Sequence, residues 1–151
     1  ESEIRETLDA VGVDLIQFHG DETPAFCDQF RRPWIKAIRV KQAIDVAVTC
    51  EQYKSARGVL LDSWHDNARG GTGIAFDWNL AQGEWSKPVL LAGGLNADNV
   101  AEAVERVRPW AVDVSSGVEQ SPGCKDSVKI TQFVESVRRA DAKLDGAVHD
   151  Q

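Results

Sequence analysis

The chain has 151 residues, of which 42% are hydrophobic and 27% charged, and its formal net charge is −7 at pH 7. This length and composition predict one globular domain with a core of its own. The negative charge argues against a nucleic-acid partner, because phosphate contacts need clustered Lys and Arg, and no apolar run approaches the roughly 18 residues of a membrane span. A small anionic ligand remains compatible with this charge, because a few backbone amides can hold one phosphate.

The cysteines and histidines form no paired motif. Cys27, Cys50 and Cys124 are odd in number and widely spaced, which favours reduced thiols in a cytoplasmic protein. The histidines are spread as widely, so the sequence predicts no metal site. The chain contains no Met and starts within a helical pattern, from which we expect a piece of a longer protein.

Apolar runs of strand character alternate with helical patterns. In chain order, the predicted elements are a helix over 4–11, a strand over 14–19, a helix over 23–31, a strand over 34–40, a helix over 44–53, a strand over 59–62, a short helix over 77–82, a strand over 88–92, a helix over 97–107, a strand over 111–114 and a helix from 126 to about 140. Thr23, Asn96 and Asp126 are the predicted helix N-caps. Residues 1–140 are expected to form a single domain, followed by a polar, frayed tail over 141–151.

This alternation with short connections is typical of the α/β class, in which helical crossovers link parallel strands. Two architectures fit the pattern: a doubly wound sheet and a (β/α)8 barrel. In both, functional residues lie at the carboxyl ends of the strands and in the loops that follow.

Two carboxylates occupy such positions. Asp62 directly follows the apolar run VLL, and a carboxyl group at the rim of an apolar core suits general-acid chemistry near neutral pH; the alternative is a residue that starts a turn. Asp113 lies within AVDV and shares a face with Ala111 and Ser115, so that face is expected to look into the site. The alternative for Asp113 is an ion pair with a buried cation such as Lys36.

Three further side chains are candidates for substrate binding. Gln17 and His19 lie on one face of their strand because side chains alternate with a period of two. The alternative for His19 is a structural histidine held by local hydrogen bonds. Lys36 and Arg39 point to opposite faces of the next strand, and Lys36 is the one expected to face the ligand, unless it is a surface cation.

Two glycine-containing loops follow the last two predicted strands and are candidates for phosphate binding. Gly93 and Gly94 form the first, and Ser115, Ser116 and Gly117 the second. Glycines let the backbone approach an anion closely, and consecutive loops in this order match the phosphate site of (β/α)8 barrels; the alternative is two tight turns. The long loop over 63–75 contains RGGTG without a following GK[ST], which excludes a nucleotide-binding P-loop. Its length is typical of a lid over a site, and the alternative is a plain disordered loop.

Taken in order, these segments resemble the phosphoribosylanthranilate isomerases of tryptophan biosynthesis. The matching segments are QFHGDE at 17–22, IKAIRV at 35–40, LLDS at 60–63, GGTG at 70–73, FDW at 76–78, LAGGL at 91–95 and VDVSSGVE at 112–119. The resemblance runs to about residue 139 and implies a (β/α)8 TIM barrel, of which this chain would supply about strands four to eight, the C-terminal part. The complete protein is expected to be a monomer or a homodimer.

The resemblance implies the Amadori rearrangement of N-(5'-phosphoribosyl)anthranilate, a sugar-phosphate substrate, without cofactor or metal. Asp62 matches the family's general acid. The loops of Gly93, Gly94 and Ser115–Gly117 match its phosphate site, and Asp113 and His19 match positions near the anthranilate and ribose.

The family's general base is a cysteine in a CGIT-like segment that ends its first strand, and an arginine on its second unit contacts the anthranilate carboxylate. The chain contains neither feature, so we expect no turnover from it alone. Two alternatives stay open: another sugar-phosphate barrel enzyme, such as indole-glycerol-phosphate synthase or ribulose-phosphate epimerase, and a non-catalytic phosphate-binding module.

Overall fold

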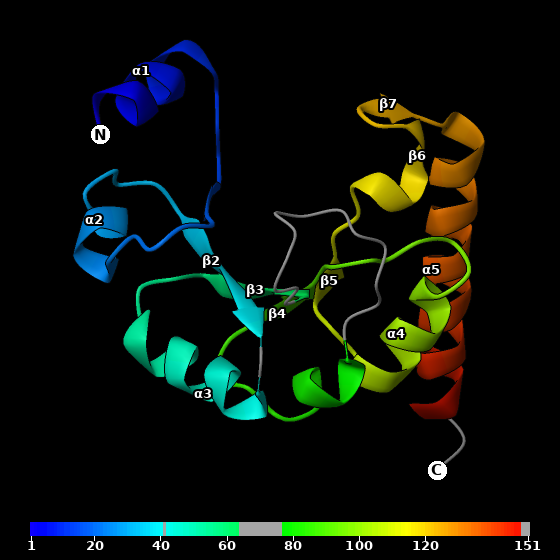
Figure 1. Cartoon of the computed structure of the whole chain (residues 1–151). Helices are drawn as coiled ribbons and strands as arrows, with labels where there is room; N and C mark the ends of the chain where they lie inside the picture. Colours follow the sequence, from blue (N-terminus) through cyan, green and yellow to red (C-terminus); the bar gives the residue numbers. More distant parts are fainter. Residues whose placement is uncertain (41, 64–76, 149–151) are drawn as a thin grey trace.

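A computed structural model describes residues 1–40, 42–63 and 77–148 (Figure 1). In chain order the elements are α1 (Ser2–Ala10), β1 (Ile16–Phe18), α2 (Pro24–Asp28), β2 (Trp34–Val40), α3 (Ala43–Gln52), β3 (Gly58–Ser63), the 3₁₀ helix η1 (Trp78–Ala81), β4 (Val89–Leu91), α4 (Val100–Val107), β5 (Ala111–Val112), the 3₁₀ helix η2 (Ser116–Val118), β6 (Glu119–Ser121), β7 (Cys124–Lys125) and α5 (Ser127–Val148). The predicted lid over 63–75 falls almost wholly outside the described residues.

Five parallel strands form the main sheet, in the order β1-β2-β3-β4-β5. Each strand therefore pairs with its neighbour along the chain. A doubly wound sheet reverses its strand order at a switch point, and the described strands show no reversal. Because crossovers between parallel strands are right-handed, an order that always advances the same way puts the connecting helices on one face. The α/β prediction is confirmed, and the doubly wound alternative is excluded for these strands.

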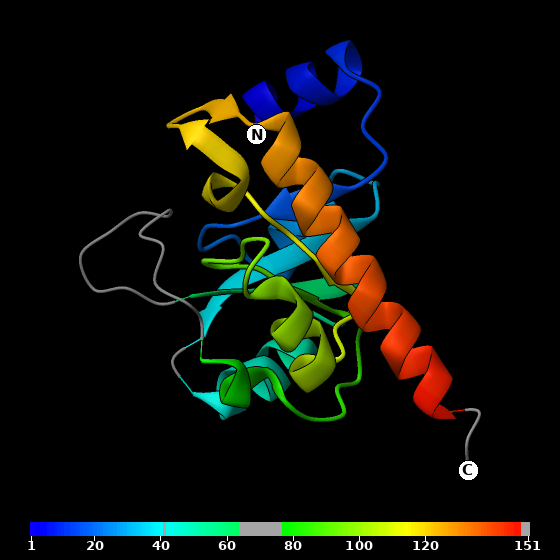
Figure 2. The same ribbon diagram turned by 90° about the vertical axis from the view of Figure 1, so that its right-hand side faces the viewer.

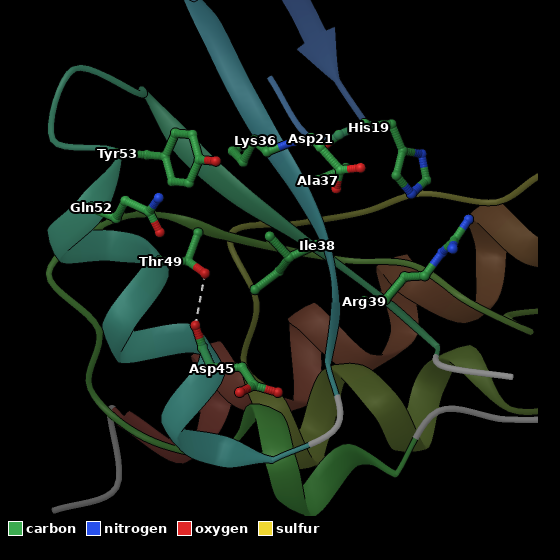
Figure 3. A pocket seen from close by; sticks show the side chains of 11 residues that line it. His19, Asp21, Lys36, Ala37, Ile38, Arg39, Asp45, Thr49, Gln52 and Tyr53 are labelled. Carbon is green, nitrogen blue, oxygen red and sulfur yellow. Dashed lines mark hydrogen bonds between the residues drawn. The ribbon is translucent and has the colours of Figure 1, made fainter. Parts of the chain in front are cut away.

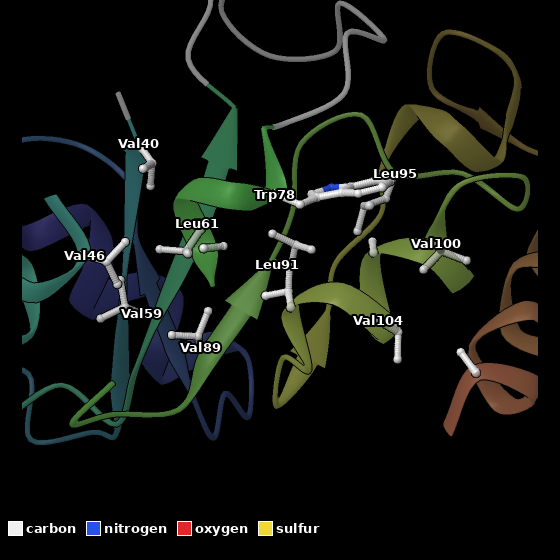
Figure 4. Close-up of a cluster of buried hydrophobic side chains, with 14 of the residues drawn as sticks. Val40, Val46, Val59, Leu61, Trp78, Val89, Leu91, Leu95, Val100 and Val104 are labelled. Carbon is white, nitrogen blue, oxygen red and sulfur yellow. The ribbon is translucent and has the colours of Figure 1, made fainter. Parts of the chain in front are cut away.

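The main core lies between this sheet and its helices (Figure 4). Alternation along the strands directs Val59, Leu61, Val89 and Leu91 into it, and Leu61 and Leu91 are fully buried. The opposite face of the sheet carries a smaller apolar cluster, made of Ile35, Ala37, Leu60, Leu90 and Ala92. Apolar packing therefore covers both faces near the middle of the sheet.

The predicted N-caps are confirmed at two of three positions. Thr23 accepts a hydrogen bond from the Phe26 amide, and Asp126 accepts from the amides of Val128 and Lys129. Asn96 instead accepts from the amides of residues 98 and 99 in a turn, and α4 begins at Val100, so its prediction as the helix N-cap is wrong.

The prediction of a frayed tail from residue 141 is wrong, because α5 continues to Val148 (Figure 2). Ala140 is buried and Leu144, one turn later, packs against the main core. Lys143 also pairs with Glu105 of α4 at 2.6 Å, and these contacts hold the last turns of the helix against the domain. The antiparallel hairpin of β6 and β7 was not predicted.

Candidate active site

Backbone pairing brings the ends of β3, β4 and β5 to one level. The amide of Ala92 donates to the carbonyl of Leu61, and the amide of Asp113 donates to the carbonyl of Leu91, both at 2.8 Å. Since Leu61, Leu91 and Val112 pack into the helix-covered core, the residue after each of them points to the opposite face. Asp62, Ala92 and Asp113 therefore face the same space, on the side away from the helices.

That space is a cavity of about 560 Å³ at the carboxyl ends of the strands. Nine of the ten predicted site residues line this cavity, namely Gln17, His19, Asp62, Gly93, Gly94, Asp113, Ser115, Ser116 and Gly117. Leu60, Ala92 and Leu95 add apolar wall. A few polar groups converging in a cavity of this size is typical of a small-molecule site.

His19 and Asp62 are two titratable side chains that lie close together in this cavity. The Nε2 atom of His19 lies 3.6 Å from Oδ2 of Asp62, and the two side chains are 40% and 22% exposed. His19 follows β1 and Asp62 lies near the end of β3, so the pair spans β2. A substrate that enters the cavity meets both side chains.

The two predicted phosphate loops lie against each other in the wall of the cavity. Gly93 and Gly94 have φ angles of 81° and 68°, a left-handed conformation that glycine adopts without strain. The side chain of Asn99 donates to the carbonyl of Gly94 at 3.0 Å and accepts from the Asn96 amide at 2.8 Å, which fixes the first loop. The second loop reaches the cavity through Ser115, Ser116 and Gly117.

Lys36 lies outside this cavity, in contrast to its predicted role in substrate binding (Figure 3). Its side chain points to the helix-covered side of β2, where it is 3% exposed and pairs with Glu22 at 3.0 Å. Side chains along β2 alternate between the two faces of the sheet as expected, but Lys36 was assigned to the wrong face. Ile35 and Ala37 occupy the face that carries the cavity. The geometry gives no support to a substrate contact by Lys36, or to an ion pair between Lys36 and Asp113.

The hairpin of β6 and β7 adds Glu119 and Pro122 to the cavity wall, and no strand or helix pattern pointed to them. A hydrogen bond from Lys125 to the Glu119 carboxylate, at 2.8 Å, lowers the pKa of that group, and the amide of Gly123 also donates to it. Lys125 donates as well to the carbonyl of Ser115 at 2.9 Å. The hairpin thereby ties a charged group to the second phosphate loop.

Neither a metal centre nor a membrane span emerges from the residues that the structure describes. No three His, Cys, Asp or Glu side chains there are grouped to hold a metal ion. No helix within the same ranges is long and apolar enough to cross a membrane.

The sequence matches a family model over residues 1–136, that of N-(5'-phosphoribosyl)anthranilate isomerase. The chain belongs to this family. Among the family's curated members, the isomerase of Pseudomonas putida strain GB-1 is 54% identical over 138 residues, which cover 91% of this chain and 67% of the relative. The isomerase of Pseudomonas syringae pv. tomato is 56% identical over 135 residues, covering 89% and 66%. The chain thus spans about two thirds of the length of these isomerases.

Solved structures of the family agree with the fold. The phosphoribosyl anthranilate isomerase of Thermotoga maritima superposes with a TM-score of 0.78 at 35% identity, over 91% of this chain and 67% of that one. A family structure in complex with reduced 1-(o-carboxyphenylamino)-1-deoxyribulose 5-phosphate superposes with a TM-score of 0.71 at 32% identity, over 91% and 66%. The resemblance that the sequence motifs indicated is therefore confirmed.

Proposed function

We propose that the cavity serves the Amadori rearrangement of N-(5'-phosphoribosyl)anthranilate in tryptophan biosynthesis. One observation carries the proposal: Asp62 and His19 line the same cavity as the loops of Gly94 and Gly117. A sugar-phosphate substrate needs both features in one cavity, because its phosphate must be bound while an acid lies near its ring. The likeness to family members, one of them bound to a reduced product, supports the same substrate class.

Asp62 is the proposed general acid. Its carboxyl proton goes to the furanose ring oxygen as the C1'–O4' bond breaks, and the bond's electron pair stays on that oxygen. The nitrogen lone pair forms the C1'=N iminium. A base then removes the C2' proton, the C2'–H electrons form the C1'=C2' bond, and the nitrogen regains its pair. The enolamine becomes the ketone when its hydroxyl loses a proton and C1' gains one.

The base of the second step is not one of this chain's cysteines. Cys27 and Cys50 are buried in α2 and α3, and burial raises the pKa of both thiols, which disfavours the thiolate that a base would need. Cys124 is exposed on β7 and does not line the cavity. The positions of the three cysteines therefore give none of them this role.

In the same proposal, the five parallel strands correspond to consecutive units of a (β/α)8 barrel, about strands four to eight. Their sequential order and their helices on one face support it. The cytoplasmic location and the monomer or homodimer remain predictions. The expectation that this chain alone is inactive, and the alternatives of another barrel enzyme or a non-catalytic module, receive no support from the comparisons.

The test combines binding with turnover. Calorimetry measures binding of the reduced product to the 151-residue chain, with inorganic phosphate as competitor, and chromatography follows conversion of N-(5'-phosphoribosyl)anthranilate to its ketone isomer. Binding that phosphate weakens supports the proposed loops. Binding that phosphate leaves unchanged, or an absence of both binding and conversion, overturns the assignment.

A further inference from the structure

The buried ammonium group of Lys36 forms hydrogen bonds with the backbone on both sides of His19. The Nζ atom of Lys36 donates to the carbonyl of Phe18 at 3.4 Å and to the carbonyl of Gly20 at 2.5 Å, the residues that flank His19. Its third contact is the Glu22 carboxylate, at 3.0 Å. The acceptors thus belong to the last residue of β1 and to the loop that follows it. Lys36 itself projects from β2, the strand next to β1.

Glu22 and Tyr53 complete this arrangement. The Glu22 carboxylate accepts from the amide of Gly20 at 2.9 Å, and the Tyr53 hydroxyl donates to the carbonyl of Glu22 at 3.0 Å. Lys36 Nζ also lies 5.7 Å from the centre of the Tyr53 ring, within the range of a cation–π contact. Figure 3 shows Lys36 between Tyr53 and the loop of Asp21 and His19.

The charge state of this cluster follows from its contacts. Burial raises the pKa of Glu22, but hydrogen bonds from its own backbone and from Lys36, with the charge of Lys36, outweigh burial, so that the net shift is downward. Glu22 is therefore a carboxylate at neutral pH and balances the ammonium. An ammonium has three protons to donate, and Lys36 has three acceptors within reach, so no proton remains for a ligand.

The side chain of Lys36 is only 3% exposed. Burying its charge costs free energy unless its hydrogen-bond partners stay in place, because a buried charge loses its hydration and needs those partners to replace it. The loop conformation that satisfies Lys36 is thus strongly preferred. That same conformation fixes the backbone of His19, since the acceptor carbonyls belong to its two chain neighbours. Rigid support of this kind is what a functional side chain needs to hold its geometry.

We infer that Lys36 is a positioning residue, which clamps the loop of Phe18 to Glu22 and thereby holds the His19 imidazole beside Asp62. The inference rests on the proposed function, which makes the His19–Asp62 pair part of the active site. It gives Lys36 a role in the site without contact with the substrate.

The test measures how strongly His19 senses Asp62. The ring C–H signals of His19 are recorded by carbon-13 NMR at pH 7 and assigned with a His19→Gln variant. The readout is the change in their chemical shift that Asp62→Asn causes, referred to below as the displacement. In the Lys36→Met background we expect this displacement to fall at least about twofold, because electrostatic coupling weakens with distance. A residue that only stabilises the fold would lower the melting temperature and leave the displacement unchanged.

Lys87→Met is the matched control. Lys87 also donates to two backbone carbonyls two residues apart, those of Lys54 and Ala56, at 2.7 and 3.0 Å, but at the opposite end of the sheet. We expect this variant to lose stability and to keep the full displacement of the His19 signals. If the displacement falls equally in both backgrounds, general loosening explains it and the inference is overturned.

Two milder variants cover the case in which Lys36→Met does not fold. Glu22→Gln removes the counter-charge, and Tyr53→Phe removes the hydroxyl that holds the Glu22 carbonyl; both should reduce the displacement. An unchanged displacement in folded Lys36→Met, or in both milder variants, overturns the positioning role alone. If Asp62→Asn leaves the His19 signals unchanged in the wild-type background, the pairing of His19 with Asp62 in the proposed site is contradicted as well.

Discussion

Gly117 lies so close to the carbonyl oxygen of Leu95 that a Cβ atom on it would stand only 1.8 Å away. No side chain fits at such a distance, so the two proposed phosphate loops can meet only with glycine at this position. The Cβ would also come within 3.1 Å of Asn96, at the end of the first loop. This contact brings together the segments that follow β4 and β5.

Gly117→Ala should therefore push the loops apart and weaken anion binding. We expect a loss of about 1–3 kcal/mol in the free energy of unfolding, the usual range for overpacking. The affinity for inorganic phosphate should fall by at least about tenfold, because both loops must supply their amides together. Thermal unfolding and calorimetric titration measure the two effects.

Gly12→Ala is the control for this substitution, since a Cβ there meets nothing within 4 Å. It should change neither the melting temperature by more than about 2 °C nor the phosphate affinity. Equal phosphate affinity in Gly117→Ala and wild type would show that the anion does not bind across these loops.

Asp62→Asn should separate chemistry from binding. The amide keeps the shape of the side chain but has no acidic proton for the ring oxygen, and general acid–base groups contribute about 10²–10⁴-fold to rate. We expect kcat to fall within that range while affinity for the reduced product changes by less than about threefold. The comparison is made with Asp9→Asn, an exposed aspartate on α1. A loss of turnover below about threefold would remove Asp62 from the mechanism.

The pairing of Glu22 with Lys36 predicts a specific loss of stability in acid. The pKa of Glu22 is lowered in the folded protein from the ordinary value of 4.5. Burial opposes this shift, and hydrogen bonds from the backbone of Glu22 and from Lys36, together with the charge of Lys36, cause it. A group with a lowered folded pKa stabilises the fold above its unfolded pKa, and this contribution is lost as pH falls through the folded value. The loss should begin near pH 4.5 and grow below it.

The measurement is the free energy of unfolding in urea between pH 7 and pH 3, for wild type and Glu22→Gln. Since glutamine does not titrate, the variant should be less stable at pH 7 and should lose less stability on acidification. Two parallel curves would mean that Glu22 contributes nothing to the acid sensitivity.

The positions of Asp62, Asp113 and the glycine loops could be predicted because they depend on local pattern. Parallel strands bring their carboxyl ends to one edge, so the residue after each apolar run had to lie there. The face of Lys36 could not be predicted in the same way. Alternation fixes which residues share a face, but only the packing of α3, which brings Tyr53 over β2, decides which face is covered.

The extent of α5 and the hairpin of β6 and β7 also depend on contacts that no local pattern shows. Residues 141–148 look like a polar tail, and they become helical where Leu144 reaches the core and Lys143 reaches Glu105. The hairpin is held by Lys125, whose bonds to Glu119 and Ser115 join segments up to ten residues apart. Such contacts arise only once the sheet has placed its partners.

The last prediction concerns the two outer strands of the sheet, β1 and β5, each of which pairs on one side only within the described residues. An open strand edge exposes amides and carbonyls that another chain can pair with. Apolar side chains accompany both edges: Leu15 is 45% exposed before β1, and Trp110 is 73% exposed before β5. An apolar cavity of about 360 Å³ also opens between α1 and β1.

We therefore expect the 151-residue chain to associate as its concentration rises, and light scattering during gel filtration measures this association. Leu15→Lys should reduce this association, because a charge at an edge opposes strand pairing. Val48→Lys, at a more exposed position on α3, should leave it unchanged. A chain that stays monomeric at every concentration would show that these edges do not recruit a partner.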